Sequence, residues 1–144
     1  MVMTLSPAER AFVEVQRVGR LATVDARGEP HVVPVCYAYD GARFYTPIDE
    51  KPKRGDRPLK RVRNVMETGR AALVIDRYDE DWSRLAWVMV RGWAQILEPG
   101  HPEHGKALVL LRQRYHQYQE MELERLPVIA LTPERVTSWG VLVG

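Results

Sequence analysis

The 144-residue chain lacks the features that mark several large classes of protein. Its single cysteine, Cys36, excludes a disulfide within the chain and favours a reducing compartment, so we expect a cytoplasmic protein. No apolar run approaches the roughly 20 residues that a membrane-spanning helix needs, and the N-terminal stretch lacks the pattern of a secretory signal. We therefore expect no membrane association, and one globular domain over residues 1–144.

The chain also lacks the short motifs of familiar chemistry. It has no G-x-S-x-G nucleophile motif and neither glycine-rich phosphate loop. His101 and His104 have no third ligand nearby, so we expect both on the surface and no metal site. Cys36 lies within a predicted strand, where a role in the core or an interface is favoured over catalysis. The catalytic residues are unknown at this point.

Hydrophobic periodicity predicts a mainly β chain with peripheral helices. A capping box at Ser6 and Glu9 predicts a first helix that Gly19 can end. Three short strands follow, separated by the turns "DARGEP" and "DGA", and Pro34 indicates an edge or a bulge in the second. Short turns between strands favour a small antiparallel barrel. Further helices are predicted over 58–69 and 101–122, and further strands over 70–78, 84–98 and 126–144.

The strand over 84–98 has two different faces. Its even positions, from Ala86 to Ile96, are small and apolar, which fits the inside of a barrel. Its odd positions include Trp87, Met89 and Trp93, and a face that meets only solvent seldom carries such residues. We therefore expect this face to contact a partner subunit or a ligand.

A basic segment follows the third strand and has three possible explanations. Between Lys51 and Arg63 the chain holds seven basic residues and one acid, although its net charge is only +2. The segment is a solvated loop, a nucleic-acid contact, or a site for a phosphorylated or polyanionic small molecule. Because the aromatic residues lie on the strands and not among the basic residues, nucleic acid is the least favoured partner.

Several stretches together resemble a known family. They are "GRLATVDARGEPHVVPVCYAYDGARFYTPI", the basic segment ending in "KRVRNV", "RAALVID", "YDEDWSRLAWVMVRGWAQIL" and "PERVTSWG". Their order and spacing, from Val18 to Gly140, resemble the flavin and deazaflavin split-barrel proteins related to pyridoxamine 5'-phosphate oxidase. In more detail, they look like the actinobacterial branch that uses coenzyme F420. The resemblance implies a six-stranded antiparallel split β-barrel with peripheral helices, and a homodimer with cofactor sites at its interface.

The resemblance also implies the residues of the cofactor site. Lys60 and Arg61 are implied to hold a phosphate together with Lys53 and Arg54, in a segment that begins at Lys51. Many relatives have a lysine two residues before "RN", where this chain has Arg61 with Lys60 beside it. Trp82 or Trp87 of the partner subunit is implied to cover the ring. The residues implied to border the ring are Val33, Pro34, Val35, Tyr45, Thr46 and Pro47.

Charge favours F420 over FMN as the cofactor. FMN ends in one phosphate, whereas F420 carries a phosphodiester and a polyglutamate tail, which seven cations suit better. The implied activity is that of an F420-dependent oxidoreductase that transfers hydride from the reduced deazaflavin to an unsaturated small organic substrate. Tyr45, Tyr37 and His31 are possible proton donors, and water would serve equally well. The alternatives are an FMN-binding protein like pyridoxamine-phosphate oxidase and a non-catalytic cofactor carrier.

Overall fold

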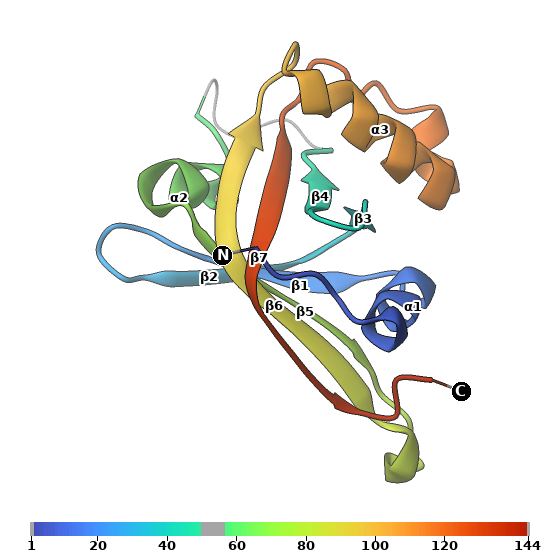
Figure 1. Ribbon diagram of the computed structural model, residues 1–144. Coiled ribbons are helices and arrows are strands. Elements are labelled where there is room, and N and C mark those ends of the chain that lie inside the picture. The colour runs from blue at the N-terminus through green and yellow to red at the C-terminus, as the bar shows by residue number, and fades with distance from the viewer. Residues whose placement is uncertain (1, 50–56, 144) are drawn as a thin grey trace.

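The computed structural model describes residues 2–49 and 57–143, which form one curled antiparallel sheet with helices around it (Figure 1). Within these residues the sheet has seven strands, in the order β2-β1-β5-β6-β7-β4-β3. The expected antiparallel split barrel is confirmed, with one more strand than the six implied. The elements are α1 (Pro7–Val15), β1 (Gly19–Val24), β2 (Pro30–Val35), β3 (Ala38–Tyr39), β4 (Phe44–Pro47), α2 (Lys60–Thr68), β5 (Arg70–Arg77), η1 (Trp82–Arg84), β6 (Ala86–Leu97), α3 (Pro102–Arg114), η2 (His116–Gln119) and β7 (Val128–Gly140).

The seventh strand arises because the second predicted strand breaks at Cys36 and Tyr37. The Tyr37 amide donates to the Tyr115 hydroxyl at 3.1 Å, and the Tyr37 carbonyl accepts from Arg114 Nε at 2.8 Å. Side chains thus take the backbone groups that a continuous strand would pair with a neighbour. As a result β2 and β3, two residues apart in the chain, lie at opposite edges of the sheet. The expected edge position of Pro34 is confirmed, because β2 is an edge strand.

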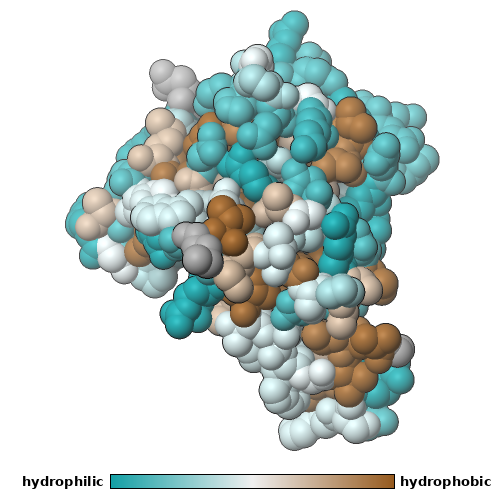
Figure 2. All heavy atoms as spheres, in the orientation of Figure 1, coloured by the Kyte–Doolittle hydropathy of each residue, from teal (hydrophilic) through white to brown (hydrophobic). Residues whose placement is uncertain are grey.

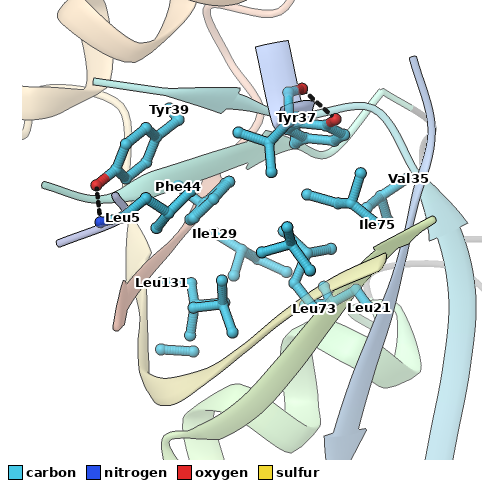
Figure 3. Packing of buried hydrophobic residues seen from close by; sticks show 14 of the residues in the cluster. Leu5, Leu21, Val35, Tyr37, Tyr39, Phe44, Leu73, Ile75, Ile129 and Leu131 are labelled. Carbon is cyan, nitrogen blue, oxygen red and sulfur yellow. Dashed lines mark hydrogen bonds between the residues drawn. The ribbon is translucent and has the colours of Figure 1, made fainter. Parts of the chain in front are cut away.

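The main core fills the inside of the curled sheet (Figure 3). As expected, the even positions of β6 point inward, and Val88 and Val90 are fully buried. Residues of α1 and α2 complete this core, whereas α3 covers a second apolar cluster beside β4. The labelled core residues come from six strands, the break between β2 and β3, and the N-terminal stretch, namely Leu5, Leu21, Val35, Tyr37, Tyr39, Phe44, Leu73, Ile75, Ile129 and Leu131.

The first helix ends earlier than expected, at Val15, and Gly19 begins β1 instead. The last turn of α1 has no basic residue of its own. Arg114, the last residue of α3, donates from Nη1 to the Glu14 carbonyl at 2.7 Å and from Nη2 to the Gln16 carbonyl. A guanidinium from a distant helix therefore binds carbonyl groups at the end of α1.

The expectation for His104 was wrong. Its side chain is 4% exposed, and Nε2 lies 2.8 Å from the Leu126 carbonyl oxygen, so it fastens α3 to the chain before β7. His101 is the N-cap of α3 and accepts a hydrogen bond from the Glu103 amide at 3.1 Å. The predicted third helix also stops at Arg114, and a short 3-10 turn, η2, follows it. None of the helices in the described parts of the chain is long and apolar enough to cross a membrane.

Candidate functional site

A cleft opens beside the C-terminal ends of β2 and β4. It has a volume of about 190 Å³, and we call it the β2–β4 cleft. One wall comes from the end of β2, the opposite wall from the end of β4, and α2 and η2 close the ends. Its lining residues are Val18, Pro34, Val35, Cys36, Thr46, Pro47, Asp49, Arg61 and Tyr118.

Residues implied to bind the cofactor meet in this cleft. Pro34 and Val35 lie on one wall, Thr46 and Pro47 on the other, and Arg61 projects from the first turn of α2. These five come from three segments separated in the chain, and the break after β2 brings them together. The combination of apolar walls and a guanidinium suits a flat ring that carries an anionic group.

Two other implied residues of this set lie away from the cleft lining. Val33 packs against the main core. Tyr45 is fully buried, and its hydroxyl lies 2.9 Å from Asp40 Oδ2 and 2.8 Å from Glu103 Oε2. Arg43 Nη1 also donates to Glu103, at 2.8 Å. Burial, followed by the hydrogen bonds to Glu103 and Asp40, raises the pKa of Tyr45 well above its usual range.

The structure distinguishes Lys60 from Arg61. Lys60 Nζ forms an ion pair with Asp25 Oδ2 at 3.1 Å, so Lys60 is directed to the β1–β2 turn. The pKa of Asp25 is lowered, first by the Glu29 amide and then by Lys60. Arg61 is the residue of the pair that lines the cleft. At the start of α2, Leu59 is the N-cap and gives no side-chain cap, which leaves the helix N-terminus favourable for an anion.

His31 lies close enough to Arg61 and Lys60 for their charges to act on its imidazole. Burial lowers the pKa of His31, and the charges of Arg61 and Lys60 lower it further. Its Nδ1 is buried and has no hydrogen-bond partner in the described part of the chain. An anion bound near Arg61 would offset these charges and raise the pKa of His31.

Four residues of the cleft, Val18, Cys36, Asp49 and Tyr118, are not among the site residues that the sequence implied. Tyr118, in η2, is 5% exposed, and its hydroxyl donates to Asp49 Oδ2 at 2.9 Å. Burial, a hydrogen bond with the Cys36 thiol and the charge of Asp49 all raise the pKa of Tyr118. In the sequence Tyr118 belongs to an apolar helical stripe, and Asp49 merely follows a strand. No local pattern indicates that the two meet.

The remaining implied residues lie elsewhere or outside the described residues. Trp82 is 70% exposed in η1, at the far end of the arm formed by β5, β6 and β7. Trp87 lies on the outer face of β6, beside a second cleft of about 320 Å³ that Arg20, Val74, Asp76 and Met89 also line. Lys51, Lys53 and Arg54 fall outside the described residues.

The comparisons with known proteins agree with this fold. The family model described as pyridoxamine 5'-phosphate oxidase matches residues 5–140, so the chain belongs to that split-barrel family. A 5a,11a-dehydrotetracycline/5a,11a-dehydrooxytetracycline reductase from Streptomyces rimosus is 32% identical over 140 residues, covering 96% of this chain and 85% of that protein.

Two solved structures show the same fold. A FAD-binding protein from Mesorhizobium loti is 26% identical with a TM-score of 0.68, covering 96% of both chains. A conserved hypothetical protein from Mycobacterium tuberculosis is 24% identical with a TM-score of 0.71, covering 96% of this chain and 86% of that one.

The residues of the cleft fit part of a flavin-type cofactor. Pockets that enclose a drug-sized ligand usually measure about 300–1,000 Å³. The β2–β4 cleft, at about 190 Å³, is smaller and open to one side. The described residues of the chain thus offer walls for a ring and a cation for a phosphate, but not a full enclosure.

Proposed function

We propose that the protein is an oxidoreductase that binds a flavin-type cofactor, F420 in preference to FMN, in the β2–β4 cleft. Its reaction is the reduction of an unsaturated small organic substrate. The observation that carries the proposal is the meeting of Pro34, Val35, Thr46, Pro47 and Arg61 around one cleft. The S. rimosus relative supports the reaction class, since its name describes a reductase of dehydro compounds.

When bound, the cofactor supplies the hydride chemistry. This chain's residues bind and orient it: the apolar walls hold the ring, and Arg61 with the first turn of α2 holds a phosphate group. Such a reaction needs no nucleophile in the protein, which accounts for the absence of such motifs in the sequence.

The preference for F420 over FMN rests on charge. Lys60 and Arg61 stand at the end of a segment with seven cations, more than one phosphate requires. The FAD-binding relative from M. loti favours FMN or a related flavin as the second candidate. The two candidates differ in their tails, so the basic segment is the part of the chain that distinguishes them.

The proposed active form is a homodimer. The outer face of the sheet presents Trp87 and Met89 beside the second cleft, and Trp139, paired with Trp87 in the neighbouring strand, is 53% exposed. Figure 2 shows apolar side chains at the end of the arm near the C-terminus, where Val141 and Val143 are exposed. A second copy of the chain would cover this surface and complete the enclosure of the β2–β4 cleft. The single cysteine favours the cytoplasm as the compartment, which cell fractionation would test.

The test of cofactor identity is a fluorescence titration with F420 of defined tail lengths and with FMN. We expect F420 to bind more tightly than FMN, and a longer tail to strengthen binding. Arg61→Glu should weaken F420 binding by a factor of about 10 or more, the loss of one charge-assisted contact. Arg125→Glu is the matched control, because the Arg125 side chain is 88% exposed and lies outside the cleft lining. Tighter binding of FMN would contradict the F420 assignment, and equal losses in both variants would remove Arg61 from the site.

A further inference from the structure

The lining of the β2–β4 cleft includes the phenol of Tyr118, which has no part in the binding of the ring or the phosphate proposed above. Tyr118 reaches the cleft from η2, with its ring packed edge-on against Tyr115 at a centroid distance of 5.5 Å. Its hydroxyl donates to Asp49 Oδ2 at 2.9 Å, and Asp49 and Cys36 both line the cleft. The ring is therefore held by the core while the hydroxyl stands at the wall of the cleft.

The other phenols named as possible proton donors are committed elsewhere. The Tyr37 hydroxyl donates to the Val13 carbonyl at 2.5 Å in the core. The Tyr45 hydroxyl contacts Asp40 and Glu103, and Tyr45 is not among the residues of this cleft. His31 is likewise absent from the cleft lining. Among the described residues that line the cleft, Tyr118 is the one tyrosine.

We propose that Tyr118 is the general acid of the reduction, and that Asp49 restores its proton from solvent. This inference rests on the proposed reductase function. The hydride pair forms a C–H bond at the β-carbon of an enone, and the electrons of the C=C bond move toward the carbonyl oxygen. The Tyr118 O–H bond breaks as its proton forms the second C–H bond at the α-carbon. The reduced cofactor is thereby oxidised, the C=C bond is reduced, and the phenolate takes a proton from water through Asp49.

Two features of the site suit this role. An ordinary tyrosine has a pKa of about 10, so the Tyr118 phenol is protonated, and therefore able to donate, at neutral pH. Asp49 is exposed, so the residue that contacts the hydroxyl also contacts solvent. A side chain fixed on one wall also delivers its proton to one face of the substrate, whereas free water reaches both faces.

The test compares wild-type protein with Tyr118→Phe and with a control, Tyr39→Phe. Tyr39 is a buried phenol whose hydroxyl donates to the Gly41 carbonyl at 3.0 Å, outside this cleft. Each protein is titrated with F420 by fluorescence. It is then given reduced F420 and a 2-methyl cyclic enone in D2O, and the faces of the α-carbon that carry deuterium are determined.

We expect Tyr118→Phe to bind F420 within about twofold of wild type, and its turnover number to fall by about 10²–10⁴. Deuterium should enter one face in wild type and Tyr39→Phe, and both faces in Tyr118→Phe. Asp49→Asn should slow turnover but keep the selectivity, since the phenol remains. Unchanged rate and selectivity in Tyr118→Phe would overturn this inference while leaving the reductase function in place. Failure of the wild type to oxidise reduced F420 would overturn both.

Discussion

At the scale of single residues, three tyrosines show that position determines the use of a phenol. Tyr37 binds the end of α1, Tyr45 binds two carboxylates, and Tyr118 stands at the cleft. Tyr37 and Tyr45 were possible proton donors in the sequence, and Tyr45 was also implied to border the ring. The sequence did not mark Tyr118, because the residue in contact with it, Asp49, is 69 positions away. Pairings of this length depend on the finished fold.

The network around Tyr45 predicts an acid-dependent contribution to stability. Burial would raise the pKa of Asp40, but the amides of Arg43 and Ala42 and the hydroxyl of Tyr45 outweigh it, so the pKa is lowered. The pKa of Glu103 is lowered first by Tyr45 and also by Arg43. Since both carboxyl pKa values are depressed in the folded state, the network stabilises the fold above the unfolded values near about 4. That contribution is lost as the pH falls through the folded values.

We therefore expect Tyr45→Phe to lower the free energy of unfolding by about 1.5–3 kcal/mol at pH 7. The loss should shrink as the pH falls, because protonated carboxyls gain less from the hydroxyl. Urea unfolding of both proteins at several pH values between about 7 and 3 measures this. A difference that is the same at every pH would show that the hydroxyl does not act through the carboxylates.

At the scale of elements, alternation predicted the two faces of β6 correctly but not where strands break. The inner face of β6 was readable because side chains in a strand alternate strictly. The break after β2 depends on Tyr115 and Arg114, which are 78 and 77 residues from Tyr37. The end of α1 also depends on a distant residue. Arg114 binds the carbonyl groups of Glu14 and Gln16, and α1 ends at Val15, ahead of Gly19.

A bulge between β6 and β7 depends on Gly92. The register shifts between Arg91 and Gly92, and a Cβ added at Gly92 would lie 2.0 Å from the Thr132 carbonyl oxygen. Because that atom belongs to the backbone, Gly92→Ala forces the two strands apart. We expect a loss of several kcal/mol, more than the roughly 1–3 kcal/mol typical of overpacking.

Gly105→Ala is the matched control. Gly105 lies within α3, and a Cβ there would meet nothing within 4 Å. Alanine is the better helix former, so we expect this variant to gain about 0.5–1 kcal/mol. Thermal unfolding of both variants measures the contrast, and equal stabilities would contradict the close approach at Gly92.

At the scale of the whole molecule, the curled sheet encloses the main core, and the outer face of β6 carries Trp87 and Met89. The family resemblance predicted the split barrel, and the Trp and Met residues in the sequence of β6 predict a contact surface on its outer face. What the sequence left open was the depth of the cleft, because that depends on how the ends of β2, β4 and η2 meet. The contribution of Lys51, Lys53 and Arg54 stays a prediction.

The proposed dimer predicts the effect of a charge on the outer face. Met89 lines the second cleft with Trp87 and Val74, so Met89→Glu would bury a charge in the proposed interface. We expect wild type to sediment as a dimer and this variant as a chain of 16.6 kDa. Met66→Glu, at a methionine of α2 that is 68% exposed, should remain dimeric. A monomeric wild type would contradict the proposed interface.

The most direct test of the central claim is a single-turnover reaction of the wild-type protein with reduced F420 and a series of enones, under anaerobic conditions. We expect the protein to oxidise the cofactor with at least one acceptor, and the product to be the enone reduced at its C=C bond. Tight binding of reduced F420 with no oxidation by any acceptor would contradict a reductase and favour a cofactor carrier.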